Sequence, residues 1–395
     1  MSFEIALSGI NAINDQLDTI SNNIANSGTY GFKSSRANFA SAYAGTQPTG
    51  VQIGSLTQSI AVGGSIISTG RSLDAAIQGR GFFVTRDAGS GATQYSRVGI
   101  FNVDKDGYLT DSYGKRAQGY AAIAGSSALG AYGDLSVPTG QVAAKASDTL
   151  QYVGNLSADW TPPSSAVFSS TDPLSFNSSA VSTVYDSLGA QHTVTQYFVK
   201  TGAGIDVHYA FDGTALGTTT ALTFDTAGQL TAPAAPVALN LGTPAGAAAL
   251  TVNLSYAGST QFAGQATTTV NSTNGYASGT LTGVSLAADG TLLAQYSNGQ
   301  KQSAGTLALA TFPNEDALTA VSDTAWVSSA ASGNALLFTP GSGMAGKLAT
   351  GALEQSNVDV TSQLVGLMTA QRNYQANSKV ISTENAMVQA LMQAV

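Results

Sequence analysis

The sequence predicts a multidomain, mainly β protein in which two antiparallel β domains are nested between N- and C-terminal α-helices that form a coiled-coil-like inner domain. All ten prolines lie between Pro48 and Pro340, so both ends are free of the strongest helix breaker. Both ends also carry apolar residues at heptad spacing. From residue 51 to 284 the pattern changes to short alternating runs bounded by Gly, Asn, Asp and Pro, which is typical of strands.

The N-terminal segment predicts one helix, from about residue 3 to 26, with an apolar seam that lasts about two heptads. Its members alternate spacings of three and four: Ile10, Ile13, Leu17, Ile20 and Ile24. Such a stripe is not buried by a lone helix. Two interpretations stay open: both terminal helices belong to the core of one globular domain, or they pair with each other and with neighbouring subunits.

The C-terminal segment predicts a second helix over residues 361–395. One row of residues recurs every seven positions: Val360, Leu367, Tyr374, Ile381, Val388 and Val395. A second, partly polar row fills the intervening seam positions: Leu364, Gln371, Ser378, Asn385 and Met392. If the helices drive self-assembly, we expect cohesion from the N-terminal seam together with Leu364, Leu367, Tyr374, Ile381 and Val388.

The middle of the chain predicts antiparallel sheets. Residues 193–200 and 250–256 alternate as strands do, and five pairs of residues suit tight turns. These pairs are Asp106-Gly107, Asp212-Gly213, Asn274-Gly275, Asp289-Gly290 and Asn298-Gly299. Helical ends around a β middle imply nested domains, each built from an outgoing and a returning segment.

The composition favours a polymer subunit over a cytosolic enzyme. Only 10% of the residues are charged, so packing against copies of the same surface removes few hydrated charges from water. A net charge of -8 without clustered Lys and Arg argues against nucleic acid as a partner. The absence of cysteine excludes disulfides and thiolate metal sites, and no apolar run is long enough for membrane insertion. The N-terminus also lacks the features of a secretory signal peptide, so an extracellular location would need another export route.

Candidate catalytic, cofactor and metal sites are weak. Residues 341–347 fit the first seven positions of a P-loop, but Leu348 stands where Ser or Thr must hold magnesium, and a following helix is doubtful. Asp104, Asp106 and Asp111 do not have the spacing of a calcium loop and predict a turn. The two histidines, His192 and His208, are expected to be ordinary surface residues. We therefore predict no catalytic, cofactor or metal residues and no enzyme activity.

Specific motifs at both ends resemble those of the bacterial flagellar rod and hook axial protein family. Residues 22–33 resemble the family element in which a helix ends in an Asn-rich turn followed by Gly-Phe-Lys, and residues 79–83, 95–97, 351–359 and 370–377 resemble further family motifs. The motif residues of the N-terminal element are Asn22, Asn23, Ala25, Asn26, Gly31, Phe32 and Lys33. Residues 181–200 and 289–312 resemble hook subunits in particular, whereas residues 201–280 match only loosely.

The resemblance implies a structural subunit of the flagellar hook, an extracellular homopolymer that forms a flexible tube and transmits motor torque from rod to filament. It implies four parts: a terminal helical assembly domain (1–27 with 361–395), a linker region (28–71), an inner β domain (72–145 with 285–360) and an outer β domain (146–284). It also implies four partners: the hook cap protein, the distal rod protein, the hook-filament junction protein and the flagellar type III export apparatus. A distal-rod or junction-type axial protein, a surface adhesin or glycan-binding β protein, and a P-loop enzyme are the alternatives.

Overall fold

The chain divides into two compact units. A computed structural model describes residues 2–44, 46–123, 126, 128–165 and 167–394. Unit 1 comprises residues 1–139, 283–295 and 301–395, and unit 2 comprises residues 140–282 and 296–300. Unit 1 is therefore built from an outgoing and a returning segment, as the nesting of helices around β structure led us to expect. Unit 2 overlaps the segment 146–284 that the sequence analysis assigns to an outer β domain.

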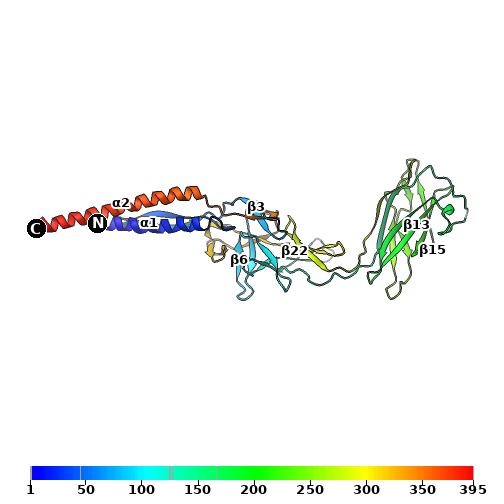
Figure 1. The fold of residues 1–395 in the computed structure, drawn as a ribbon, viewed down its shortest axis with the longest axis horizontal. Helices are drawn as coiled ribbons and strands as arrows, with labels where there is room; N and C mark the ends of the chain where they lie inside the picture. Colours follow the sequence, from blue (N-terminus) through cyan, green and yellow to red (C-terminus); the bar gives the residue numbers. More distant parts are fainter. Residues whose placement is uncertain (1, 45, 124–125, 127, 166, 395) are drawn as a thin grey trace. The chain divides into compact units, whose positions relative to one another are not determined.

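Unit 1 contains the two long helices, α1 (Ser2–Ala25) and α2 (Val360–Ala394), which lie side by side (Figure 1). Asp359 caps the start of α2, because its Oδ1 accepts the backbone N–H groups of Thr361 and Ser362 at 3.0 and 3.3 Å. Within the described residues, neither helix combines the length and the apolar character needed to cross a bilayer.

The strands of unit 1 form a long hairpin, a large sheet and two short two-stranded sheets. The hairpin is β1 (Ser35–Ala44) with β2 (Gln47–Gln58), and the two short pairs are β3 (Ile66–Ser68) with β28 (Ala352–Glu354) and β4 (Ala75–Gln78) with β27 (Lys347–Thr350). The large sheet comprises β5 (Phe82–Arg86), β6 (Thr93–Ser96), β7 (Phe101–Val103), β8 (Leu109–Asp111), β9 (Arg116–Ala122), β10 (Leu129–Asp134), β20 (Leu281–Leu286), β21 (Thr291–Tyr296), β22 (Lys301–Leu307), β23 (Leu309–Thr311), β24 (Thr319–Val321), β25 (Ala325–Val327) and β26 (Leu336–Phe338), with a short 3-10 helix at Glu315–Ala317.

Both halves of the chain contribute to the core of unit 1. Strand β5 pairs with β23, and Phe82 from the first half contacts Phe312 and Trp326 from the second, with ring centroids 6.1 and 5.7 Å apart. The indole Nε1 of Trp326 donates to Gln58 Oε1 at 2.8 Å, so its polar atom is satisfied inside this core. The β domain of unit 1 therefore forms only when the returning segment meets the outgoing one.

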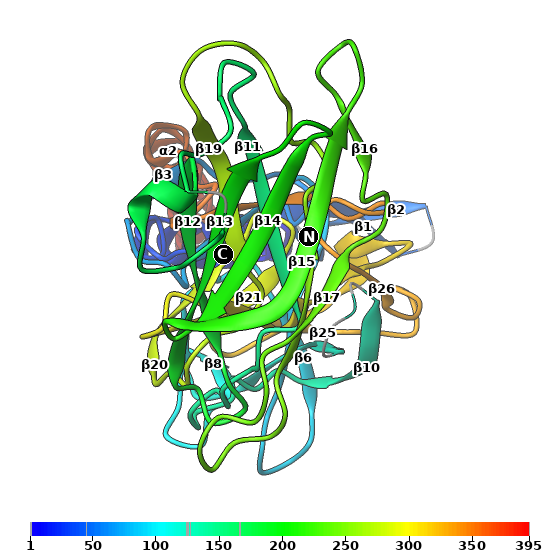
Figure 2. The ribbon, with the colours of Figure 1, turned by 90° about the vertical axis from the view of Figure 1, so that its right-hand side faces the viewer.

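Unit 2 consists of two sheets that enclose one apolar core. The first sheet contains β12 (Ser178–Tyr185), β13 (Gln191–Lys200), β14 (Ile205–Phe211), β15 (Thr214–Phe224) and β16 (Leu230–Ala232), and β13, β14 and β15 are seen side by side in Figure 2. The second contains β17 (Val237–Asn240), β18 (Thr251–Ser255), β11 (Thr149–Asn155) and β19 (Thr267–Thr273), and a 3-10 helix spans Pro173–Ser175. Phe198 and Val207 of the first sheet share a buried cluster with Tyr152 and Leu254 of the second.

Two details differ from the expectation of purely antiparallel sheets joined by tight turns. Strands β11 and β18 pair in parallel, because the chain passes through the whole first sheet before it returns to the second. The pair Asn274-Gly275 does not make a left-handed turn, and Asn274 Oδ1 instead accepts the N–H groups of Asp148 and Thr149. In the other four pairs the glycine has a positive φ: Gly107, Gly213, Gly290 and Gly299.

Candidate assembly site at the terminal helices

The contact between α1 and α2 is narrow. Ile13 and Ile20 of α1 are buried together with Ala370 of α2, and Leu17, Ile24 and Leu367 pack around them partly buried. The two helices approach more closely at Gly9, where an added Cβ would lie 3.0 Å from Asn377 Nδ2, than at Gly366, where it would lie at an ordinary contact distance of 3.4 Å from Ile20 Cδ1. The helices run antiparallel, because Asn23 near the end of α1 contacts Gln363 near the start of α2.

The residues of α2 that face α1 lie one position before one of the two rows of the predicted seam. The row that faces α1 contains Gln363, Ala370 and Asn377, whereas the predicted row begins at Leu364, which is 46% exposed. Polar and small residues occupy the facing row, so a search for apolar side chains selects the neighbouring one. Leu367, from the other predicted row, packs against the buried cluster.

The ten residues predicted to mediate assembly lie in different surroundings. Ile13 and Ile20 are buried, while Ile10, Leu17, Ile24, Leu367 and Ile381 are partly buried. The exposed remainder comprises Leu364, Tyr374 and Val388, all on α2. The structure brings four of the α1 residues together with Leu367: Ile13, Leu17, Ile20 and Ile24. Ile10 and Ile381 lie outside this cluster, and three of the α2 residues are exposed.

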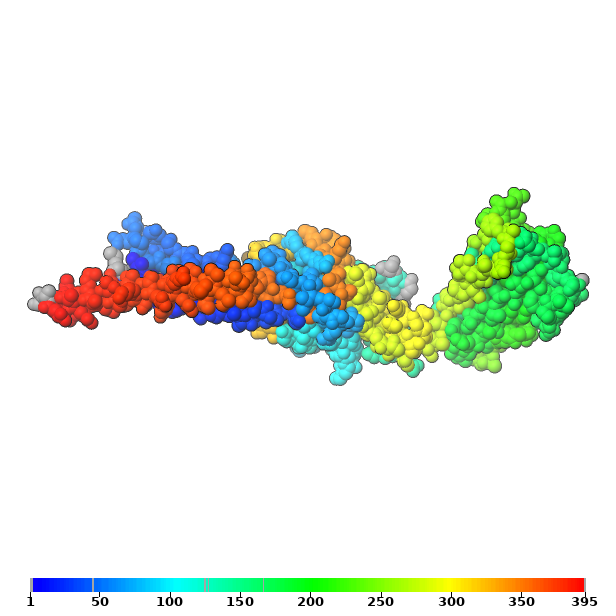
Figure 3. Space-filling view, turned by 45° about the horizontal axis from the view of Figure 1, so that its top comes forward, coloured from blue at the N-terminus to red at the C-terminus, as the bar shows by residue number. Residues whose placement is uncertain are grey.

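Both helices carry apolar side chains that the described part of the chain does not cover. We call this set the uncovered apolar residues: Phe3, Ile5, Leu7, Val360, Leu364, Val365, Met368, Tyr374, Val380, Met387, Val388, Leu391 and Met392. The C-terminal part of the longer helix α2 extends beyond the start of α1, and the space-filling view shows one side of α2 open along its length (Figures 1 and 3). Many exposed large apolar side chains on one pair of helices are typical of a protein interaction site.

The Asn-rich element ties the end of α1 to the segments around it. Asn23 is 1% exposed; its Nδ2 donates to Ser35 O at 2.7 Å and to Gln363 Oε1 at 3.1 Å, while its Oδ1 accepts Ser35 N–H at 2.9 Å. Asn26 Nδ2 donates back to Asn22 Oδ1 at 2.7 Å, which closes the last helical turn. Ala25 is exposed at the end of α1, so only the asparagines make these side-chain contacts.

The Gly-Phe-Lys part of the element continues these contacts. Gly31 has φ 69°, and a Cβ there would come within 3.0 Å of the Arg97 backbone, so glycine is required. The partly buried Phe32 accepts a hydrogen bond from Asn357 N at its backbone oxygen, at 3.3 Å. The element therefore fixes the base of α1 against the segment that leads into α2.

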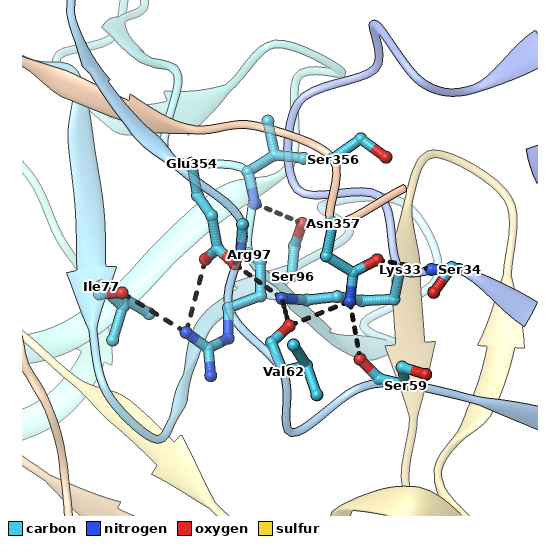
Figure 4. A network of polar contacts seen from close by, with 12 residues as sticks. Lys33, Ser34, Ser59, Val62, Ile77, Ser96, Arg97, Glu354, Ser356 and Asn357 are labelled. Carbon is cyan, nitrogen blue, oxygen red and sulfur yellow. Dashed lines mark hydrogen bonds and ion pairs between the residues drawn. The ribbon is translucent and has the colours of Figure 1, made fainter. Parts of the chain in front are cut away.

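Lys33 takes part in a buried ion-pair cluster at the base of the two helices. Its Nζ donates to Glu354 Oε1 at 2.6 Å and to Val62 O at 2.7 Å, and Arg97 Nη1 donates to Glu354 Oε2 at 3.4 Å (Figure 4). All three charged side chains are at most 1% exposed. Glu354 Oε1 also accepts Gly64 N–H at 3.0 Å, so one carboxylate holds two cations and a backbone group.

Burial determines the electrostatics of this cluster. Removal from water lowers the pKa of Lys33, and the nearby Glu354 carboxylate offsets only part of that effect. Burial likewise lowers the pKa of the Arg97 guanidinium, again against the attraction of Glu354. Since two cations share one carboxylate, the cluster depends on Glu354 more than on either cation alone.

Asn357 completes the base of the helices. Its Oδ1 accepts Ser34 N–H at 2.7 Å, and its Nδ2 donates to Ser59 O and Val62 O at 2.9 and 3.0 Å (Figure 4). The sequence analysis included Arg97, Glu354 and Asn357 in family motifs but did not assign them to a site. The one available signal was the scarcity of charge, which makes each Glu or Arg in a motif a candidate for a specific pair.

The candidate chemical sites do not assemble. Gly341 N donates to Gly346 O at 2.8 Å, and strand β27 begins at Lys347, so a strand follows the P-loop-like residues where a phosphate site needs a helix. Asp104 and Asp111 each cap a separate turn through their own backbone neighbours. Among the residues that the structure describes, there is no group of three or more His, Asp or Glu placed to hold a metal ion.

The two histidines are partly exposed, and each has specific neighbours. His192 lies between two aspartates in unit 2, and its side chain is only 17% exposed. His208 stacks on Phe168, with ring centroids 4.1 Å apart. The sequence predicted surface histidines but did not reveal which neighbours the strands bring to each of them.

Comparisons with known proteins identify the relationships of the chain. It matches four domain families: Flagella basal body rod protein at residues 3–33, Flagellar hook protein FlgE/F/G D1 domain at 76–150, Flagellar basal body protein FlaE D2 domain at 155–276, and Flagellar basal body rod FlgEFG protein C-terminal at 349–394. These matches include both terminal helices and both β regions.

Full-length relatives agree with the domain matches. The chain is 40% identical over 403 residues to the flagellar hook protein FlgE of Salmonella typhimurium, with 99% of each chain covered. It is 38% identical over 401 residues to that of Escherichia coli, again with 99% of each covered, and 32% identical over 455 residues to that of Treponema pallidum, with 98% of this chain and 97% of the relative covered. The crystal structure of Helicobacter pylori flagellar hook protein FlgE2 is similar in fold, with a TM-score of 0.53 at 14% identity over 71% of this chain and 98% of that one. The chain therefore belongs to the flagellar hook protein FlgE family.

Proposed function

We propose that this chain assembles through its terminal helices, with the uncovered apolar residues of α1 and α2 packing against the helices of neighbouring copies. The observation that carries the proposal is the exposure of large apolar side chains along α2, including Leu364, Val388 and Met392 at 46%, 55% and 75%. A helix with this much apolar surface gains free energy when a second surface removes it from water.

The chain is a structural subunit of the bacterial flagellar hook, the extracellular part of the flagellum that is attached to the basal body. In our account a head-to-tail contact between subunits that does not close into a ring produces an open helical tube. The helices supply axial cohesion in this tube. The charge-poor β surfaces move against those of neighbouring copies, so that the tube bends while it transmits torque from rod to filament.

The finer features of this function are part of the same proposal. The chain acts without catalysis, and its partners are the hook cap protein, the distal rod protein, the hook-filament junction protein and the flagellar type III export apparatus. Its four working parts are residues 1–27 with 361–395, 28–71, 72–145 with 285–360, and 146–284. The separation of unit 2 supports the last boundary, and the cluster around Glu354 supports a distinct junction between helices and β domain.

Electron microscopy of negatively stained polymers tests the assembly surface. Under conditions that promote polymerisation, we expect tubes from the wild type and only monomers from the double variant Leu364→Asp with Val388→Asp. Both side chains are exposed, so the substitutions place charge on the assembly surface without opening the contact between α1 and α2. The matched control, Leu364→Met with Val388→Ile, keeps the surface apolar and should form tubes. Normal tubes from the Asp variant would refute this assignment.

A further inference from the structure

A histidine in unit 2 contacts two carboxylates that belong to different turns. His192, near the start of β13, places its Nδ1 2.7 Å from Asp212 Oδ2 and its Nε2 3.4 Å from Asp186 Oδ2. Asp186 lies in the turn between β12 and β13, and Asp212 lies in the turn between β14 and β15. The imidazole therefore connects two hairpin turns at one end of the same sheet, whose strands are visible in Figure 2.

The second oxygen of each carboxylate is also occupied by donors. Asp186 Oδ1 accepts the N–H groups of Leu188 and Ala190, both at 2.9 Å. Asp212 Oδ1 accepts Thr193 N–H at 2.8 Å and the Thr193 hydroxyl at 3.2 Å. Both carboxyl groups thus act as acceptors through both oxygens, which is the pattern of ionised carboxylates.

Two acceptors on opposite sides of the ring decide its protonation. A neutral imidazole carries one N–H and can donate to one aspartate, which would leave a nitrogen lone pair facing the other carboxylate. An imidazolium carries two N–H groups and satisfies both. We propose that protonated His192 is a pH-dependent clasp that joins the β12–β13 turn to the β14–β15 turn through Asp186 and Asp212.

The surroundings of the ring suit such a clasp. The charged side chains that face the imidazole are Asp186 and Asp212, one from each turn, and both are acidic. Phe211 packs against the ring with centroids 5.1 Å apart. Asp212 has φ 47°, a left-handed backbone conformation that is held in place by its contacts with Thr193 and His192.

The pH range in which the clasp is closed follows from the three groups. The hydrogen bond to Asp212 raises the pKa of His192 above its usual 6.5, despite partial burial. Partial burial alone would raise the pKa values of the two aspartates, but their N–H and imidazole donors lower both below 3.8. The stabilisation by protonated His192 is fully present below pH 6.5 and is lost as the pH rises through the raised pKa of His192. The stabilisation by the two aspartates is present above pH 3.8 and is lost as the pH falls through their lowered pKa values. The clasp is thus closed in weak acid and opens in alkali.

Nuclear magnetic resonance of the full chain can observe the clasp directly, because the protein has only two histidines. In protein labelled at histidine Cε1 and titrated between about pH 4 and pH 9, we expect one imidazole with a pKa above 6.5 and one below it. The lower one is the internal reference, since burial lowers the pKa of His208. The variant His208→Gln assigns the signals.

Variants of the aspartates separate the clasp from a merely structural histidine. Asp212→Asn and Asp186→Asn keep an oxygen acceptor for the turn but remove the charge, so each should lower the pKa of His192, with the larger shift for Asp212→Asn. A pKa of His192 at or below 6.5 in the wild type, or one that neither variant changes, would overturn the proposal.

A measurement on the unaltered chain keeps the test decisive if a variant unfolds. Nitrogen-15 chemical shifts of the His192 ring at about pH 7, where an unperturbed imidazole is mostly neutral, report whether each nitrogen carries a proton. Two protonated nitrogens support the clasp, and a single N–H on either nitrogen contradicts it. On the same samples, amide hydrogen exchange at Ala190 and Thr193, corrected for the intrinsic effect of pH, should accelerate as His192 loses its proton.

Discussion

Unit 2 and the terminal helices bury apolar side chains in opposite ways. In unit 2 both sheets contribute to a closed core, in which residues such as Phe198, Val207 and Leu254 have no exposed surface. The apolar cluster that joins α1 to α2 has Ile13, Ile20 and Ala370 as its buried members, while larger side chains such as Leu391 and Met392 are 68% and 75% exposed. Unit 2 is completed within one chain, whereas the helices have apolar surface left for a neighbour.

The largest expected effect comes from opening the helix contact itself. Leu17→Asp with Ile20→Asp places two charges in the seam of α1, and burial of an unpaired charge is strongly unfavourable. We expect complete loss of polymers by electron microscopy, with the β-sheet signal of unit 2 and its unfolding transition unchanged by circular dichroism. Leu17→Met with Ile20→Val should retain polymers. Loss of unit 2 structure in the Asp variant would show that the two regions do not fold separately.

The next effect concerns the cluster at the base of the helices. Glu354→Gln leaves Lys33 and Arg97 buried without their shared counter-charge, and breaking a buried pair in this way costs about 3–5 kcal/mol. Calorimetry should show a lower melting temperature for unit 1 and an unchanged one for unit 2. Lys33→Met leaves Glu354 paired with Arg97 and should cost less. An equal or larger loss for Lys33→Met would contradict the dependence on Glu354.

Acid should destabilise unit 1 through the carboxylate of Asp134. Partial burial by itself raises the pKa of Asp134, but hydrogen bonds from Arg86, Gln118 and Arg116 outweigh it and lower the pKa from 3.8 to about 2. This stabilisation is present above pH 3.8 and is lost as the pH falls towards 2. Its upper limit is about 2.5 kcal/mol, at about 1.4 kcal/mol per pKa unit. Urea unfolding of Asp134→Asn should show a smaller stability difference from wild type at pH 2 than at pH 6. A pH-independent difference would exclude this mechanism.

The smallest effect distinguishes two glycines in the helices. A Cβ at Gly366 would lie at ordinary contact distance from Ile20, so Gly366→Ala should stabilise α2 by up to about 1 kcal/mol through helix propensity. A Cβ at Gly9 would come within 3.0 Å of Asn377 Nδ2, so Gly9→Ala should stabilise the helices less than Gly366→Ala does, or destabilise them. Thermal unfolding, followed by the helical circular dichroism signal, measures the change in stability for both variants. The reverse order would mean that the helices do not pack at this register.

The elements were predictable where local pattern determines them. The heptads at both ends and the lack of Pro there predicted α1 and α2, and four of the five turn pairs have the left-handed glycine that was expected. The facing row of α2 was not predictable from hydrophobicity, because Gln363 and Asn377 take part in it. The parallel pair β11 and β18 also depends on long-range topology rather than on local sequence.

The buried cluster lay beyond sequence reasoning for a similar reason. Lys33, Arg97 and Glu354 come from three distant parts of the chain, and only the returning segment brings the carboxylate to the two cations. The family resemblance drew attention to Lys33 as a motif residue but gave no partner for it. In the same way, local sequence can indicate each of the hairpin turns that contain Asp186 and Asp212. It does not indicate that both turns lie beside His192.

Amide hydrogen exchange, compared between monomer and polymer, tests most directly whether the helices are completed by neighbouring copies. Exchange reports local opening, and α2 has few buried contacts in a single chain. We predict rapid exchange along α2 in the monomer and strong protection in the polymer, while strands β13 and β14 in the core of unit 2 exchange slowly in both. Unchanged exchange of α2 in polymers would contradict the account, because the uncovered apolar residues would then remain uncovered after assembly.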